Sequence, residues 1–394
     1  MKHPQASHAS RGPASSVQGG ARGGPACLAA IQRVACAPGQ ARRGGTTGLA
    51  WRCAWLLGGL LLAGAVSAQT AAAGQKALLA APLRVEPQQQ QRSLTDWLER
   101  LQQASRVPSY SGTYVVSSAT GTLSSAHIQH YRDGGMQIER VEVLTGEPRV
   151  TFRHNQTVLV YWPAERVVRS EQREPKTAFP DLLQPNLAAS VEAFYQAKPA
   201  GQERVAGTDA DIVVFKPRDK LRYGYRIWSE RQTGMIVKIQ TLDERGHILE
   251  QSAFSEITFQ PVRPGKLLRA MADRRGYRSE RAGERFLTTA QQEGWTLSAP
   301  VAGFTSQVCY RRPMPGEGKP MTQWVFSDGL ATVSLFMGLL DPGLPVHEGA
   351  SAIGATHVLT RRMAAGGQTW WLTAVGEVPM QTLQEFAARL QPGH

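Results

Sequence analysis

The sequence predicts an α+β protein built mostly of antiparallel β-strands, with a large, strongly curved N-terminal sheet and a small C-terminal domain. Three observations predict this fold. About ten short stretches between residues 110 and 259 alternate apolar and polar side chains with a period of two. A second series of such stretches runs from residue 305 to residue 376. Between the two series, residues 260–283 are rich in proline, glycine and arginine and hold no strand or helix period.

The first 68 residues are predicted to be removed from the mature protein. Residues 42–52 supply three arginines, residues 53–66 form a short apolar core, and Val66-Ser67-Ala68 places small residues where a signal peptidase reads. The uncharged run after Arg52 is about 16 residues long, shorter than the ~20 that span a bilayer. We therefore expect a secretory signal, cleaved after Ala68, rather than a membrane anchor.

Two further segments are expected to lie outside the folded domains. Residues 1–41 contain no acidic residue and are interpreted as an unstructured extension or as translation from too early a start. Residues 69–92 are rich in alanine and then in glutamine, which is typical of a tether. Of the four cysteines, only Cys309 follows the signal, so the mature chain cannot form an internal disulfide. Its alternating surroundings predict a buried strand thiol rather than a nucleophile.

The net charge of +13 does not indicate a nucleic-acid-binding protein. Seven of the basic residues precede residue 69, and the remaining chain has 37 basic against 31 acidic residues. Most of that remaining excess lies in residues 260–283, which hold seven basic and two acidic residues. The parts of the chain on either side are close to neutral, which excludes nucleic acid as the expected partner.

The first predicted domain, residues 93–259, begins with an amphipathic helix. Ser93 is a suitable N-cap, and Leu94, Trp97, Leu98 and Leu101 recur at helical spacing. A second helix is expected within residues 180–199, where Leu187, Val191 and Phe194 or Tyr195 have that spacing. The expected strands are Tyr110–Ser117, Ser124–Tyr131, Met136–Val143, Arg149–His154, Thr157–Trp162, Val167–Arg173, Asp211–Lys216, Leu221–Ser229, Gly234–Leu242 and Ile248–Phe259.

A sheet of this size must curve strongly, and its concave side must be filled. The filling is either side chains with a helix, which is ordinary core packing, or a lipid-sized hollow. The aromatic residues that would line it are Tyr110, Tyr114, Tyr161, Trp162, Tyr223, Tyr225 and Trp228. Asp133-Gly134-Gly135 and Asn155-Gln156 are expected to be turns between strands.

Residues 260–283 are interpreted as a basic hinge linker between two domains. Two uses of its arginines stay open at this point. They are either solvated side chains of an ordinary linker or contacts to an anion or a partner at the domain junction.

The second predicted domain, residues 284–394, is a small α+β unit. Ser327-Asp328-Gly329 is expected to be a hairpin turn, and Trp370 and Trp371 are expected on opposite faces of one strand. The chain is expected to end in a helix after Pro379, with Leu383, Phe386 and Leu390 at helical spacing. The expected strands are Thr305–Arg311, Gln323–Ser327, Thr332–Met337, Thr356–Met363 and Thr369–Gly376.

A search for catalytic motifs favours a binding protein over an enzyme. The sequence has no Gly-x-Ser-x-Gly elbow, and Gly316-Glu317-Gly318-Lys319 lacks the remaining residues of a phosphate loop. His127 and His130 are three apart in an expected strand and therefore on opposite faces, where they cannot share a metal. No catalytic residue, metal or cofactor is expected.

Several ordered motifs resemble the RseB/MucB family of periplasmic sigma-E regulators. They are Arg222-Tyr223-Gly224-Tyr225-Arg226-Ile227-Trp228, then Leu249-Glu250-Gln251 with Phe254, and Phe326-Ser327-Asp328-Gly329-Leu330 after Arg311-Arg312-Pro313. The resemblance covers most of residues 93–390. One departure is the family's W-x-P-x-G-F stretch, which is longer here, from Trp295 through Pro300 to Phe304.

The resemblance implies a half-open barrel similar to the lipoprotein-carrier fold, joined to a smaller domain. It also implies a periplasmic protein that binds the periplasmic part of a membrane-spanning anti-sigma factor, shields it from proteolysis, and releases it on lipid or lipopolysaccharide signals. A periplasmic lipid or lipoprotein carrier is the alternative, and a homo-oligomer stays open. The side chains expected to contact the partner or a lipid are Arg263, Arg274, Arg275, Arg278, Trp162, Tyr225, Trp228, Arg311, Arg312 and Trp370.

Overall fold

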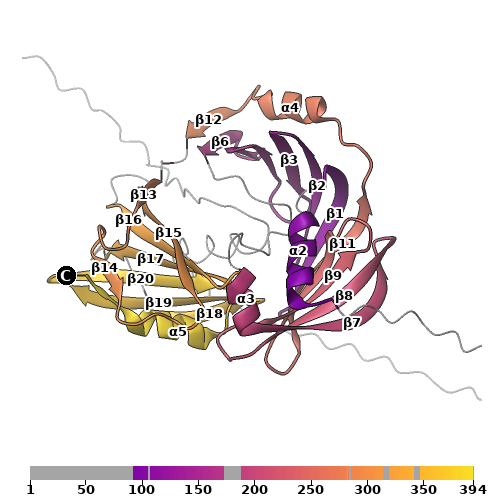
Figure 1. Ribbon diagram of the computed structural model, residues 1–394. Coiled ribbons are helices and arrows are strands. Elements are labelled where there is room, and N and C mark those ends of the chain that lie inside the picture. Colours follow the sequence, from indigo (N-terminus) through magenta and orange to yellow (C-terminus); the bar gives the residue numbers. More distant parts are fainter. Residues whose placement is uncertain are drawn as a thin grey trace, which may run out of the picture. The chain divides into compact units, whose positions relative to one another are not determined.

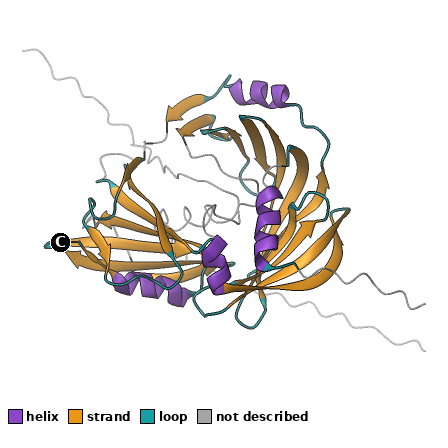
Figure 2. Cartoon of the chain, viewed as in Figure 1, coloured by secondary structure: helices purple, strands orange, loops and turns teal. Residues whose placement is uncertain are grey.

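The computed structural model describes residues 92–104, 107–172, 188–281, 283, 285–313, 319–340 and 347–393, all within one compact unit. The predicted signal and nearly all of the predicted tether lie outside these residues, as do Leu187 and the Gly316-Glu317-Gly318 stretch. Two sheets hold most of the strands (Figures 1 and 2). No helix among the described residues is long and apolar enough to cross a membrane.

The larger sheet has twelve strands, and all neighbours except one pair are antiparallel. The exception is the parallel pairing of β12 with β6. Its strands are β1 (Ser109–Ser118), β2 (Leu123–Asp133), β3 (Met136–Val143), β4 (Arg149–His154), β5 (Thr157–Trp162), β6 (Val167–Gln172), β7 (Tyr195–Val205), β8 (Thr208–Pro217), β9 (Gly224–Glu230), β10 (Ile236–Leu242), β11 (Ile248–Thr258) and β12 (Arg278–Arg281). Their order is β12-β6-β5-β4-β3-β2-β1-β11-β10-β9-β8-β7. The predicted mostly antiparallel fold is confirmed, as a large open sheet rather than a closed barrel.

The predicted turns join strands as expected. Gly134 between β2 and β3 has a φ of 52°, and Asn155 between β4 and β5 has a φ of 50°. Asparagine tolerates this left-handed conformation because its short amide can bond locally. Here the Asn155 Oδ1 accepts a hydrogen bond from the Gln137 N–H at 2.9 Å, which also ties the turn to the neighbouring strand.

Helix α2 (Leu94–Ala104) packs on one face of the larger sheet. Its N-terminus is capped reciprocally: the Asp96 N–H donates to Ser93 Oγ at 3.1 Å, and the Ser93 N–H donates to Asp96 Oδ2 at 2.8 Å. Trp97, Leu98 and Leu101 are buried in one cluster with side chains of β8, β9 and β10. This helix supplies side-chain filling for the sheet, as the core-packing interpretation expects.

The segment predicted to be a linker without regular structure contains a helix and a strand, so that expectation is wrong. Helix α4 (Pro264–Ala272) starts with proline at its first turn, and Leu267 and Met271 lie four residues apart on its buried side. They pack against Ile138 of β3. Val141 of β3 packs in the cluster under the end of α2. Because side chains alternate between the two faces along a strand, Ile138 and Val141, three residues apart, point to opposite faces. Helices α4 and α2 therefore cover opposite faces of the larger sheet.

The reason for this error is that two apolar residues in one short helix do not make a visible period. The neighbouring sheet supplies the rest of the stabilisation. The Tyr161 hydroxyl donates to the Met271 carbonyl at 2.7 Å and thereby ties the end of α4 to β5. β12 then pairs with β6 through backbone bonds, which need no side-chain pattern.

The smaller sheet has seven antiparallel strands in the order β13-β15-β16-β17-β20-β19-β18. They are β13 (Phe286–Thr288), β15 (Thr305–Arg312), β16 (Met321–Ser327), β17 (Thr332–Leu339), β18 (Gly349–Ile353), β19 (Thr356–Ala365) and β20 (Gln368–Gly376). β14 (Trp295–Leu297) pairs with β21 (Leu390–Pro392). Helix α5 (Met380–Arg389) buries Leu383 and Phe386 as predicted.

Two edge strands were not indicated by the sequence. One is β18 of the smaller sheet. The other is β7 of the larger sheet, where α3 (Ala188–Phe194) leads directly into a strand that contains Pro199.

Candidate functional site

A buried ion pair joins the two sheets. Arg222 lies in the loop between β8 and β9 of the larger sheet, and Asp328 lies in the turn between β16 and β17 of the smaller one. An Arg222 guanidinium nitrogen is 2.8 Å from Asp328 Oδ2, and both side chains are 0% exposed. Asp219 adds a second carboxylate to Arg222 at 2.9 Å. Removing one partner of such a pair leaves the other charge buried, which typically costs about 3–5 kcal/mol.

Asp328 accepts hydrogen bonds from donors of both sheets, and these donors oppose the rise in its pKa that burial causes. The backbone N–H groups of Leu330 and Ala331 donate to its Oδ1 at 2.9 and 2.7 Å. The Tyr195 hydroxyl donates to its Oδ2 at 3.1 Å. The predicted Ser327-Asp328-Gly329 turn is therefore a hairpin turn that also presents a charge to the larger sheet.

The guanidinium of Arg222 is enclosed by aromatic rings. It lies 4.3 Å from the ring centroid of Phe194 and 5.1 Å from that of Phe304, and it donates to the Ala302 carbonyl at 2.7 Å. Gly303 has a φ of 79°, and a Cβ there would lie 2.7 Å from an Arg222 nitrogen. Glycine is required at this position both by the backbone conformation and by the close approach of the arginine. Three separate motifs of the sequence thus meet at one junction.

A second contact between the sheets has like charges. The turn between β18 and β19 places Gly354 against the Glu250 carboxylate of β11, and a Cβ on Gly354 would lie 3.3 Å from the Ser118 Cβ. Because His357 pairs with Gly376, the β19–β20 register brings Glu377 beside the same turn. Burial, and secondarily the charge of Glu377, raise the pKa of Glu250 to about 7.

Polar groups around this acidic contact are also buried. The Tyr223 hydroxyl lies 3.2 Å from His357 Nδ1, which lies 2.9 Å from the Val378 carbonyl. Burial lowers the pKa of His357 and raises that of Tyr223 to about 12. Burial also raises the pKa of Tyr114, and the charges of Glu250 and Glu377 add to that rise.

The aromatic residues predicted to bind a partner or lipid are mostly core residues. Tyr225 is 1% exposed and packs near Tyr195 under α2. Trp228, three residues along β9, is 3% exposed in a different cluster, and its indole N–H donates to Glu203 at 2.5 Å. Trp162 is 6% exposed, with the Arg169 guanidinium 5.1 Å from its ring. Trp370 of the smaller sheet is half-buried and packs edge-on against Trp295.

The predicted arginines are dispersed rather than gathered in one site. Arg263 precedes α4, and Arg274 and Arg275 follow it, all three exposed. Arg275 pairs with Asp273 at 2.7 Å. Arg278 pairs with Glu280 within β12. On β15 of the smaller sheet, Arg311 pairs with Glu293 at 2.9 Å and Arg312 donates to Gln323 at 3.0 Å.

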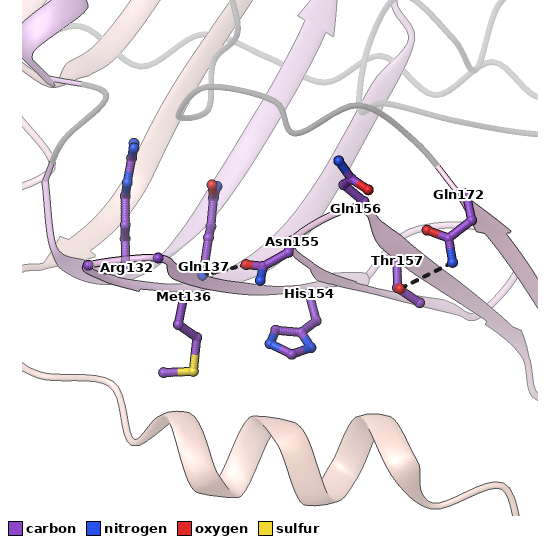
Figure 3. Close-up of a pocket in the computed structure, with 10 residues that line it drawn as sticks. Arg132, Met136, Gln137, His154, Asn155, Gln156, Thr157 and Gln172 are labelled. Carbon is purple, nitrogen blue, oxygen red and sulfur yellow. Dashed lines mark hydrogen bonds between the residues drawn. The ribbon is translucent and has the colours of Figure 1, made fainter.

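A pocket of about 600 Å³ lies where the β2–β3 and β4–β5 turns meet the end of β6. In Figure 3, Met136 and His154 point toward α4, whereas Arg132 and Gln137 point to the other side of the sheet. The lining also includes Asn155, Gln156, Thr157 and Gln172. This polar, loop-lined pocket differs from the apolar hollow that a lipid carrier would need.

The described residues contain no group of three or more His, Cys, Asp or Glu side chains that could hold a metal. Cys309 is a buried strand thiol, as predicted, and burial raises its pKa to about 11. His127 bonds to Ser111 and Thr113, while His130 on the opposite face is fully buried. The features that do stand out, the two junction contacts, join residues far apart in the sequence and were not among the predicted site residues.

The protein thus has two mostly antiparallel sheets that are joined by buried charged groups. Its described residues contain no metal cluster. Residues 93–274 match the MucB/RseB N-terminal domain and residues 289–391 match the MucB/RseB C-terminal domain. The chain belongs to the MucB/RseB family.

Relatives of established name support this assignment. The sigma factor AlgU regulatory protein MucB of Pseudomonas aeruginosa is 30% identical over 319 residues, which cover 80% of this chain and 96% of MucB. The sigma-E factor regulatory protein RseB of Escherichia coli K12 is 22% identical, over 75% of this chain and 90% of RseB. A crystal structure of MucB in complex with MucA(peri) matches with a TM-score of 0.59 and 26% identity, over 76% of this chain and 99% of MucB.

Proposed function

We propose that this chain is a periplasmic regulator that binds the periplasmic segment of a transmembrane anti-sigma factor. One observation carries the proposal: the chain shares its fold, over 99% of the solved MucB chain, with a relative seen in complex with MucA(peri). The regulatory names of the relatives agree with it. Cleavage after Ala68 would release the mature protein into the periplasm, where this segment is found.

Shielding of the segment from regulated proteolysis is the second part of the proposal. A binding protein shields by covering the backbone that a protease must reach, and this needs surface rather than catalytic groups. Two sheets locked by a buried ion pair offer a rigid surface of this kind, because Arg222 and Asp328 fix one sheet against the other.

Binding is tested by calorimetry with the mature chain and the periplasmic segment of the cognate anti-sigma factor. We expect saturable binding of one segment per chain. Heat changes no larger than those of a scrambled segment of the same composition would contradict the proposal.

Release by acylated phospho-sugars is the third part, and Arg274 and Arg275 are its proposed contacts. Both are exposed beside α4, and guanidinium groups bind phosphate through charge-assisted hydrogen bonds.

Replacing Arg274 and Arg275 with alanine should raise the lipid concentration that releases half of the bound segment about tenfold, which corresponds to about 1.4 kcal/mol. The matched control is Arg204→Ala with Arg245→Ala, which removes the same charge from the exposed end of β7 and from the exposed turn between β10 and β11. Equal half-release concentrations for all three proteins would exclude these two arginines from the response.

A further inference from the structure

The two sheets end in four edge strands, and three of these carry features that discourage pairing with another chain. β7 contains Lys198 and Pro199, with a bulge in its pairing with β8. β12 reads Arg-Ser-Glu-Arg. β13 is three residues long. Charge, proline, bulges and shortness are the usual means by which exposed edges avoid unwanted strand addition.

The fourth edge, β18, has none of these features. It reads Gly-Ala-Ser-Ala-Ile from Gly349 to Ile353, and all five residues are exposed. It pairs with β19 over its whole length without a register shift. Among the described residues, β19 is the one strand that pairs with it.

The geometry of the β18–β19 hairpin shows which backbone groups point outward. The two strands are joined by a two-residue turn, Gly354 and Ala355, and Ile353 faces Thr356 across it. In such hairpins the pair that flanks the turn is hydrogen-bonded, and hydrogen-bonded pairs then alternate along the strands. Gly349, Ser351 and Ile353 therefore bond toward β19, whereas the N–H and C=O groups of Ala350 and Ala352 point away from it.

We propose that β18 is the docking edge for an extended segment of the anti-sigma partner, which adds to the smaller sheet as a further strand. The inference rests on the proposed function and names the surface that performs it. Strand addition explains shielding directly, because proteases take extended backbone and a segment paired with β18 has its backbone groups occupied.

The composition of β18 defines the chemistry of its occupant. Glycine, alanine and serine side chains are small enough to let a second backbone approach closely. Because no charged side chain lies on the strand, the edge favours an uncharged segment rich in β-branched or aromatic residues. The turn end of the β18–β19 hairpin is anchored, because Gly354 packs against Glu250 of the larger sheet. This anchored end reduces the part of the edge that binding must order.

Two variants and one exchange measurement test the proposal. Ala352→Pro removes an outward N–H without removing a bond to β19, and Ala352→Lys adds a charge to the edge. The control Gln196→Lys adds the same charge to the exposed side of edge strand β7. Thermal unfolding of each variant checks that it folds, and calorimetry with the cognate periplasmic segment measures affinity.

We expect both Ala352 variants to bind the segment at least about tenfold more weakly, while Gln196→Lys binds like the wild type. In the wild type, the segment should slow hydrogen exchange at the amides of Ala350 and Ala352. Wild-type affinity in both Ala352 variants, or unchanged exchange at these amides, would overturn the inference and leave the proposed function standing. Concentration-dependent dimers that Ala352→Pro abolishes, with segment binding intact, would assign the edge to a second copy and also overturn it. A wild-type chain that binds no segment would overturn the proposed function itself.

Discussion

The two contacts between the sheets are built from opposite electrostatics. At the first, Arg222 meets Asp328 in a fully buried pair with four donors to the carboxylate. At the second, Glu250 lies near Glu377, and burial holds the pKa of Glu250 near 7. Burial raises the pKa of Asp328, while the charge of Arg222 and the backbone N–H donors oppose that rise. The Glu250 contact gains a proton on mild acidification, so the same two sheets are joined by one ion pair and one proton-sensitive contact between like charges.

The largest expected effect follows from breaking the first contact. Arg222→Ala leaves the Asp328 carboxylate buried without its counter-ion, and should lower the free energy of unfolding by about 3–5 kcal/mol. Urea unfolding at pH 7.5 measures this. The double variant Arg222→Ala with Asp328→Asn removes both charges and should recover part of the loss, whereas a double variant as unstable as the sum of the single ones would contradict the pairing.

Limited trypsin digestion should cut the chain first after Arg274 or Arg275, because both lie in the exposed loop between α4 and β12. Two stable fragments, residues 93–274 or 275 and the remainder, would support the proposed division into two domains. Cleavage scattered through β1 to β11 would contradict it.

The second contact should make stability depend on pH in a defined direction. A carboxyl whose folded pKa is raised from 4.5 to about 7 contributes its full stability below pH 4.5 and loses it as pH rises to 7. The loss should reach about 3–4 kcal/mol above pH 7, because the difference between a pKa of 4.5 and one of about 7 is worth roughly 1.4 kcal/mol per pH unit. Glu250→Gln should remove this slope between pH 4.5 and 7. A slope of the same size in the Glu250→Gln variant would assign the titration to another group.

The smallest expected effect comes from the hydroxyl beside the second contact. Tyr223→Phe removes its interaction with His357 and should cost about 0.5–1.5 kcal/mol. The pH slope from Glu250 should persist in this variant, so urea unfolding at pH 5 and pH 7 should show nearly equal losses. A loss at pH 7 alone would instead couple Tyr223 to the Glu250 titration.

The sequence predicted the strand-rich parts of the fold well because each half-buried strand carries its own alternation. Tyr110–Ser117 and Met136–Val143, for example, lie within or coincide with β1 and β3. It failed where backbone pairing or a neighbouring sheet supplies the stability. β18 has only small residues, β12 has a charged sequence, and α4 depends on Leu267 and Met271 packing on a sheet formed far earlier in the chain.

The site was less accessible from the sequence than the fold. Arg222, Gly303 and Asp328 all lie in motifs that the family resemblance singled out, yet only the structure shows that they touch. Glu250 and Glu377 are separated by more than a hundred residues, and no local pattern marks a carboxyl that burial will protonate. Conversely, Tyr225 and Trp228 look like binding residues because they are aromatic, but the sheet uses both as core.

Protection of the anti-sigma segment tests the proposed function most directly. The cognate periplasmic segment is incubated with its site-specific protease, with and without the mature chain, and its cleavage is followed over time. We expect cleavage to slow at least about tenfold at saturating wild-type chain and to return toward the free rate with Ala352→Pro at the same concentration. Cleavage at the free rate in the presence of saturating, folded wild-type chain would contradict the account.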